Sequence, residues 1–161
     1  MNIRVGFGYD VHQLKEGAAL WLGGIKIPHT HGATGHSDAD VLIHVICDAL
    51  LGAANLRDIG FHFSDKDPKF KGIDSKILLK EVIELLRDKN YKIGNIDTTI
   101  CLQVPRINPF VGEMKKVLAE VMNIEEEDIS IKATTTEHLG FVGREEGIAA
   151  YATVLIFKNV S

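Results

Sequence analysis

Cysteine is scarce in this sequence, with two residues in the whole chain. Cys47 and Cys101 both lie inside apolar runs, and neither has the spacing of a zinc ribbon. Buried free thiols in a reducing compartment explain this placement better than a disulfide framework does. We therefore expect a cytoplasmic protein.

Excess positive charge and long apolar runs are also missing. Lysine and arginine number 18 against 22 acidic residues, and the formal net charge is −4. No global basic field favours nucleic acid, so a phosphorylated ligand would need metal ions or local groups to neutralise it. The apolar runs are too short to span a bilayer, and a strand predicted directly after Met1 leaves no room for a signal or transit peptide. We expect neither a nucleic-acid nor a membrane partner.

The sequence does contain short strands that alternate with amphipathic helices, over a length of 161 residues that suggests one domain, 1–161. The segment Leu56–Gly72 lacks a clean period and is expected to be a long functional loop. The shorter segment His29–Gly35 is rich in histidine, threonine and glycine and is also expected to be a loop. The alternation favours an α/β (α+β) fold, a two-layer sandwich of a mixed β-sheet with helices on one face. The predicted strands are Ile3–Tyr9, Ala19–Leu22, Gly24–Ile27, Ile93–Gln103, Ile129–Thr134 and Ile148–Phe157, and the predicted helices begin near Ser37 and cover Ser75–Asn90 and Val111–Met122.

The spacing of three side chains predicts a metal site. Asp10 and His12 stand two apart in an extended segment, so they point to the same side. His44 follows on a helix, where Asp40 and Asp48 share its face and are expected to accept from its second ring N–H. One carboxylate, two imidazoles and an open fourth position are typical of catalytic zinc. The alternative reading is a strand end with a solvated acid and a hydrogen-bonded histidine.

Two further segments have chemistry that suits phosphate. His36 and Ser37 stand at the predicted helix start, where free N–H groups and the positive end of the dipole favour anions. The run Lys132–Glu137 closes a strand with three threonines, whose hydroxyls and backbone N–H groups can cradle phosphate oxygens. Glu137 can hold a hard cation such as Mg²⁺ against those oxygens. Taken singly, Ser37 is more readily explained as a helix cap, and the threonine run as a β-rich segment followed by a helix cap.

The joint pattern of motifs resembles the 2-C-methyl-D-erythritol 2,4-cyclodiphosphate synthase family, from Val5 to about Phe157. The motifs that carry the resemblance are G-x-G-x-D-V-H, H-S-D-A-D, D-I-G, D-x-D-P, K-A-T-T-T-E and L-G-F-V-G-R-E-E-G-I-A. It implies conversion of 4-diphosphocytidyl-2-C-methyl-D-erythritol 2-phosphate to the cyclic diphosphate, with release of CMP, in the non-mevalonate isoprenoid pathway.

The resemblance also implies cofactors and roles. Zn²⁺ would bind to Asp10, His12 and His44, and Mg²⁺ or Mn²⁺ to Glu137 and the substrate diphosphate. His36 and Thr135 would be catalytic by orienting phosphate oxygens. The residues that it places on the substrate are Asp10, Val11, His12, His36, Ser37, Asp58, Ile59, Gly60, Phe63, Ser64, Asp65, Lys66, Asp67, Leu102, Gln103, Val104, Pro105, Arg106, Ile107, Asn108, Ala133, Thr134, Thr135, Thr136, Glu137, Phe141 and Arg144.

An assembly is implied as well. The family forms a homotrimer in which Leu102–Asn108 and Ala133–Thr136 of one subunit form the cytidine pocket beside a neighbour's metal site. In relatives a central cavity near Tyr9, Arg144 and Glu146 holds an isoprenoid diphosphate. Two alternatives remain open on the residues: a zinc-dependent phosphohydrolase, and a non-catalytic trimer that binds isoprenoid diphosphates.

Overall fold

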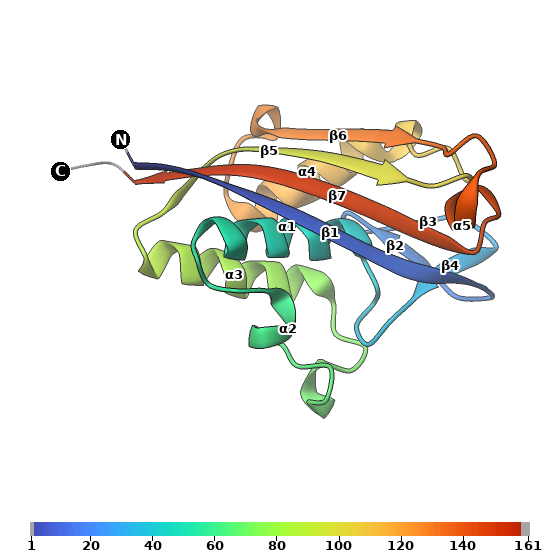
Figure 1. The fold of residues 1–161 in the computed structure, drawn as a ribbon, viewed down its shortest axis with the longest axis horizontal. Coiled ribbons are helices and arrows are strands. Elements are labelled where there is room, and N and C mark those ends of the chain that lie inside the picture. Colours follow the sequence, from blue (N-terminus) through green and yellow to red (C-terminus); the bar gives the residue numbers. More distant parts are fainter. Residues whose placement is uncertain (1, 159–161) are drawn as a thin grey trace.

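A mixed β-sheet is the centre of the computed structural model, which describes residues 2–158 (Figure 1). The strand order within the described residues is β4-β1-β7-β5-β6, and β5 and β6 are parallel while the other neighbours are antiparallel. A separate hairpin pairs β2 with β3. The strands are β1 (Asn2–Glu16), β2 (Leu20–Leu22), β3 (Ile25–Ile27), β4 (His31–Thr34), β5 (Lys92–Cys101), β6 (Ile129–Thr134) and β7 (Gly147–Lys158).

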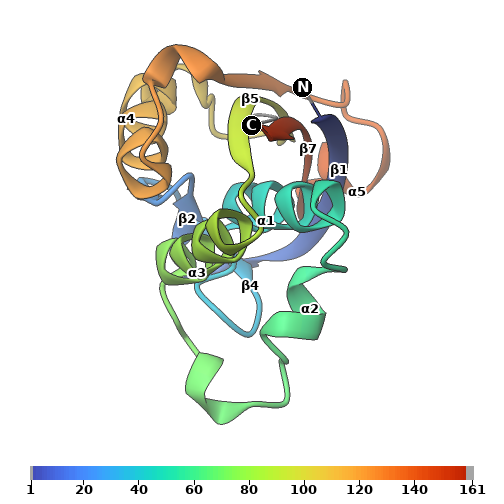
Figure 2. The same cartoon turned by 90° about the vertical axis from the view of Figure 1, so that its left-hand side faces the viewer.

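Three helices cover one face of this sheet (Figure 2). They are α1 (Val41–Ala53), α3 (Ser75–Asp88) and α4 (Val111–Met122), and short helices α2 (Ile59–His62) and α5 (Gly140–Gly143) lie in the connections. α1 is the most deeply buried helix, because it packs between the sheet and α3 and nearly all of its side chains are inaccessible to solvent. The predicted mixed sheet with helices on one face is confirmed.

Two glycines let α1 lie directly on β1. A Cβ built on Gly6 would come within 1.9 Å of the carbonyl oxygen of Ala49, and one built on Gly8 within 2.1 Å of that of Val45. A side chain at either position would therefore force the helix away from the strand. The G-x-G spacing brings the middle of α1 against β1.

The start of α1 differs from the prediction. The helix begins at Val41, because the Asp40 side chain caps it by accepting from the backbone N–H of Ile43 at 3.0 Å. The same carboxylate also accepts from the N–H groups of Gly23 and Gly24, at 2.9 and 2.7 Å. Burial raises the pKa of Asp40, although these N–H groups act to lower it. Asp40 thus fixes the β2–β3 hairpin to the start of α1.

Other predicted bounds also change, and the changes in the strands reflect pairing with distant segments. β1 continues to Glu16 instead of ending at Tyr9, because β7 and then β4 pair with its second half. β4 lies in the predicted loop His29–Gly35, and α2 and a 3₁₀ turn lie in the predicted loop Leu56–Gly72. The short helix α5 was not predicted, and α3 ends at Asp88, two residues before the predicted end.

The sheet face opposite the helices is apolar and uncovered in the protomer. Every second residue of β1 points to this face, and these side chains are exposed, including Val5 at 65% and Phe7 at 64%. The rings of Phe7 and Tyr9 stack beside Tyr151 of β7, with centroids 6.3 and 5.1 Å away. Contiguous exposed apolar surface of this kind marks an interaction face.

Candidate metal centre and active site

Three candidate ligand atoms converge where α1 crosses β1. Asp10 Oδ2 lies 3.1 Å from His12 Nε2 and 3.1 Å from His44 Nδ1, and the two ring nitrogens are 3.0 Å apart. Two of the side chains leave β1 on one side, as their spacing predicts, and α1 supplies the third. This is the metal-ligating group that the structure contains within residues 2–158.

The spacing of the three atoms suits a metal ion. Bonds of about 2.05 Å to a tetrahedral ion give ligand–ligand edges of about 3.3 Å, close to the observed separations. Burial raises the pKa of Asp10, but hydrogen bonds and charge interactions with His12 and His44 outweigh it and hold the pKa well below its usual value. The carboxylate is therefore ionised and ready to ligate.

The outer nitrogen of His44 has different partners from those predicted. Its Nε2 lies 3.0 Å from Ser37 Oγ and 3.0 Å from Ser75 Oγ. Asp40 is committed to the helix cap, and Asp48 Oδ1 accepts from the backbone N–H of Ile59 at 2.8 Å. The prediction that these two acids support His44 is wrong, because neighbouring backbone donors occupy both carboxylates.

A cavity of about 380 Å³ opens beside the ligands. It contains His36 and Ser37, although neither is at the helix start, since α1 begins four residues after Ser37. His36 Nε2 faces the carbonyl oxygen of Asp67 at 3.3 Å. The predicted site residues in its wall are His12, His36, Ser37, His44, Ile59, Gly60, Phe63 and Asp65, and the wall also contains the unpredicted Phe70, Ile73 and Leu78.

The remaining predicted residues of this region surround the cavity without lining it. Asp58 caps α2 by accepting from Phe61 N–H at 2.8 Å, and Asp67 caps the following 3₁₀ turn. Ser64 Oγ accepts from Lys66 N–H at 3.2 Å. Val11 projects to the opposite face of β1 and is exposed, so its side chain stays outside the cavity, and its N–H bonds to Asp10.

The predicted cytidine segments form a second cavity of about 260 Å³. The chain turns here through a cis peptide bond between Val104 and Pro105. Beside it, Gln103 Oε1 accepts from the N–H of His138 at 3.3 Å, which ties the two segments together. The lining residues are Leu102, Gln103, Pro105, Arg106, Ile107, Asn108, Ala133, Thr134 and Thr135.

The two cavities do not meet within one protomer. Asp10 is in register with Ala150 of β7, Ala150 with Ile100 of β5, and Ile100 with Ala133 of β6. Three inter-strand spacings of about 4.8 Å separate Asp10 from Ala133, or roughly 14 Å. The metal ligands and the predicted cytidine segments therefore lie at one level of the sheet but on different strands.

Glu137 stands alone as a candidate cation ligand. It follows β6 in a turn where both Glu137 and His138 have positive φ, at 53° and 62°. Thr135 Oγ1 accepts from its N–H at 3.3 Å, and Thr136 Oγ1 donates to the Leu139 carbonyl at 2.6 Å. The turn thus presents its carboxylate beside the threonine run.

Near the end of this region, Arg144 Nε donates to Glu146 Oε1 at 2.9 Å. This exposed pair raises the pKa of Arg144 and lowers that of Glu146, in each case chiefly through the hydrogen bond. Phe141 is exposed on the adjoining helix α5. Neither Phe141 nor Arg144 lines either of the two cavities.

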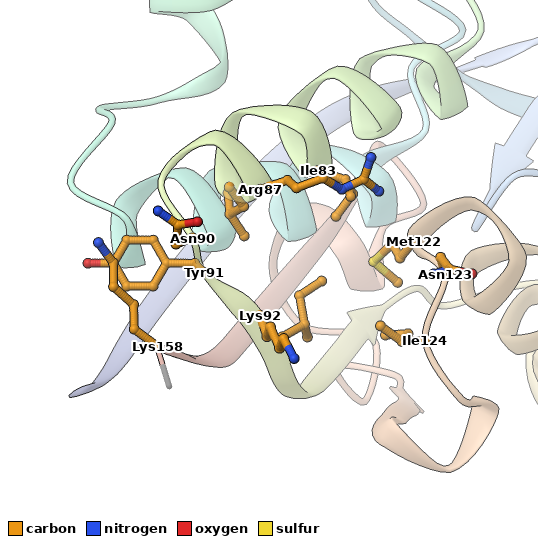
Figure 3. Close-up of a pocket in the computed structure, with 11 residues that line it drawn as sticks. Ile83, Arg87, Asn90, Tyr91, Lys92, Met122, Asn123, Ile124 and Lys158 are labelled. Atoms are coloured by element: carbon orange, nitrogen blue, oxygen red, sulfur yellow. The ribbon is translucent and has the colours of Figure 1, made fainter. Parts of the chain in front are cut away.

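Another cavity, of about 900 Å³, is unrelated to this chemistry (Figure 3). It lies between the ends of α3 and α4 and the start of β5, and no acid or histidine lines it. Two of its three cations are engaged: Arg87 pairs with Glu84 at 2.8 Å, and Lys158 lies 4.3 Å from the ring centroid of Tyr91. The smaller cavity with the converging ligands is the better candidate site.

Three side chains that could hold a metal ion, two of them in the wall of a cavity, together with a mixed sheet covered by helices on one face, indicate an α+β enzyme of the metal-dependent class. The chain belongs to the YgbB family, whose family model matches residues 3–157. None of the helices in residues 2–158 has the length and apolar character needed to cross a membrane.

Relatives of known name agree with this family. A 2-C-methyl-D-erythritol 2,4-cyclodiphosphate synthase of Parabacteroides distasonis is 68% identical over 156 residues, which cover 97% of each chain. The Plasmodium falciparum IspF complex with CDP has a TM-score of 0.87 at 40% identity and covers 98% of both chains. The bifunctional IspDF from Campylobacter jejuni has a TM-score of 0.93 at 42% identity, covering 96% of this chain and 42% of that longer one.

Proposed function

We propose that this chain converts 4-diphosphocytidyl-2-C-methyl-D-erythritol 2-phosphate to 2-C-methyl-D-erythritol 2,4-cyclodiphosphate and CMP, a step of non-mevalonate isoprenoid synthesis. The observation that carries the proposal is the convergence of Asp10, His12 and His44 beside a cavity that contains His36 and Ser37. The name shared by relatives at 61–68% identity supports the same reaction. Free thiols at both cysteines support a cytoplasmic location.

The donor set favours zinc at the triad. Two imidazole nitrogens and one carboxylate oxygen are a common ligand set for catalytic zinc, with a fourth position left for substrate. When bound there, zinc supplies Lewis-acid stabilisation of phosphate charge. Glu137 is a single carboxylate, so it would hold Mg²⁺ or Mn²⁺ only together with diphosphate oxygens, as magnesium prefers.

The residues of the site have a positioning task. An oxygen of the 2-phosphate attacks the β-phosphorus, and the bond from that phosphorus to the bridging oxygen breaks as CMP leaves with the electron pair. The nucleophile is already an anion, so no strong general base is required. His36, Ser37 and Thr135 orient the phosphate oxygens, and the wall around Gly60 holds the polyol. Alignment of two negative phosphates in line is the main task in such transfers.

A homotrimer completes the proposal. The uncovered apolar face of β1 and β7 needs a partner, and closed cyclic symmetry covers the same face on every subunit. Ala133, in the wall of the cavity that also contains Leu102 and Asn108, lies roughly 14 Å from Asp10, by three strand spacings. A neighbouring subunit would place its copy of that cavity beside them, and the solved relative with CDP supports a cytidine ligand. An isoprenoid diphosphate beside Tyr9, Arg144 and Glu146 is the second ligand proposed for the central cavity.

Phosphorus NMR of the products made from the cytidylyl substrate tests the activity. We expect two coupled resonances of a cyclic diphosphate and an equimolar CMP signal. Release of inorganic phosphate without a cyclic product would favour a phosphohydrolase, and unchanged substrate with bound isoprenoid diphosphate would favour a non-catalytic trimer. For the shared site, inactive His44→Ala chains are mixed with inactive Arg106→Ala chains. Recovered activity supports a site between subunits.

A further inference from the structure

A buried hydrogen-bonded chain runs from the proposed metal ligand His44 to the start of α3. His44 Nε2 lies 3.0 Å from Ser75 Oγ, and the Ser75 hydroxyl donates to Asp38 Oδ1 in a short hydrogen bond. Asp38 Oδ2 accepts from the backbone N–H of Ser75 at 3.0 Å. Ser75 is completely buried, whereas Asp38 and His44 are partly buried, so the Ser75 hydroxyl itself is shielded from water.

The direction of the protons follows from the donors around Asp38. The carboxylate receives two N–H groups, from Ser75 and Asp40, and one O–H group, from Ser75. A carboxylate surrounded by three donors acts only as an acceptor. The single proton of the Ser75 hydroxyl is therefore committed to Asp38, and the Ser75 oxygen faces His44 as an acceptor.

This arrangement selects one tautomer of His44. A neutral imidazole has one N–H, and an acceptor at Nε2 places the proton there. In the metal-free site Nδ1 can donate its proton to Asp10 Oδ2, 3.1 Å away, but a metal ion at the triad takes the Nδ1 lone pair, and the ring proton then lies on Nε2 facing Ser75. The tautomer that Ser75 favours is thus the one that a metal ion at the triad requires.

We propose that Ser75 and Asp38 are positioning residues that hold His44 as the Nε2–H tautomer with Nδ1 directed at the metal. The inference rests on the metal site of the proposed function and adds the groups that orient its ligand. Partners of a ligating histidine typically change metal affinity by about 10–100-fold when removed. Neither residue belongs to the wall of the cavity beside the triad.

Ser37 provides a matched control. Its Oγ is also 3.0 Å from His44 Nε2 and lies 3.4 Å from Ser75 Oγ, but it accepts from Ala39 N–H at 3.2 Å, and its hydroxyl is not hydrogen-bonded to the Asp38 carboxylate. Its hydroxyl proton is free to point toward the ring, so Ser37 does not select a tautomer. Ser75→Ala removes the hydroxyl that donates to Asp38 but keeps the hydrogen bond from the backbone N–H of residue 75 to Asp38. The variant therefore tests the orientation of His44 while the contact between Asp38 and the start of α3 stays in place.

The test measures zinc affinity by competition with a chromophoric chelator, in the full chain and without substrate. We expect Ser75→Ala to weaken zinc binding about 10–100-fold, Asp38→Asn to weaken it as well, and Ser37→Ala to weaken it less than either. Ser75→Thr, which keeps the hydroxyl, should recover affinity. Unchanged affinity in a folded Ser75→Ala protein, or an equal loss in Ser37→Ala, would overturn the proposal.

A spectroscopic signature completes the test. In zinc-loaded protein with ¹⁵N-labelled histidine, we expect a downfield, slowly exchanging Nε2–H signal from His44 that moves upfield in Ser75→Ala. A His44 ring that carries its proton on Nδ1 would refute the assignment. Neither readout uses substrate. A missing cyclic product would therefore reject the proposed function and leave this inference standing. Unchanged zinc affinity in Ser75→Ala, with normal product from the unmodified protein, would reject this inference alone.

Discussion

Gly8→Ala should separate α1 from β1 and weaken both the fold and the metal site. A Cβ at this position meets the carbonyl oxygen of Val45 at 2.1 Å, whereas ordinary contacts begin at 3.4 Å. The helix backbone must therefore move by about 1.3 Å, since the obstructing atom belongs to a backbone and cannot rotate away. Overpacking of this kind costs about 1–3 kcal/mol of unfolding free energy.

The displacement also affects metal binding, because Val45 directly follows His44. A shift of α1 by more than 1 Å increases the separations of about 3 Å that join Nδ1 to the other two ligand atoms. We expect lower zinc affinity together with a lower urea midpoint. Chelator competition measures the zinc affinity, and urea unfolding monitored by circular dichroism gives the midpoint.

Gly52→Ala is the matched control, since Gly52 is on the same helix and a Cβ there meets nothing within 4 Å. Alanine in place of this glycine should stabilise the helix by about 0.5–1 kcal/mol and leave zinc affinity unchanged. Should Gly8→Ala unfold at the same urea concentration as the unmodified protein and bind zinc equally well, the close approach of helix and strand would not be what positions His44.

Three further predictions concern the ligands and the exposed charges. His44→Ala should fold normally but lose stoichiometric zinc, and undiminished zinc by elemental analysis would reject the triad. Glu137→Gln should keep zinc and assembly but lower turnover severely, which turnover against Mg²⁺ concentration measures; an unchanged Mg²⁺ dependence would assign Glu137 to its turn alone. The Lys132 ammonium, 2.6 Å away, lowers the pKa of Asp97. The pair should contribute about 0–1 kcal/mol to the free energy of unfolding, as is usual for an exposed ion pair. This contribution should be present above the ordinary aspartate pKa and disappear as the pH falls through the lowered pKa of Asp97. Lys132→Met should raise the pKa of Asp97 in a carboxyl-detected NMR titration, and no change would refute the pairing.

Part of the site follows from local periodicity, and part of it does not. Asp10 and His12 were assigned to one side of a strand from their spacing, and the structure confirms that they converge with His44. Ser75 was predicted only as the first residue of a helix, because nothing next to it in sequence indicates that its hydroxyl reaches an imidazole 31 residues away. Asp40 was assigned the wrong partner, since the hairpin glycines that occupy its carboxylate lie 16 and 17 residues earlier.

The sequence alone determined the alternation of strands and helices, the converging ligand pair on β1 and the family resemblance, because each is written in short-range spacing or in residue identity. Tertiary structure decided the rest. The order β4-β1-β7-β5-β6 joins strands from both ends of the chain, and that order places the two halves of the proposed site on different strands. The tertiary structure also decided which hydroxyl supports His44. Hydrogen bonds between distant segments depend on packing, and packing produces no periodic pattern in the sequence.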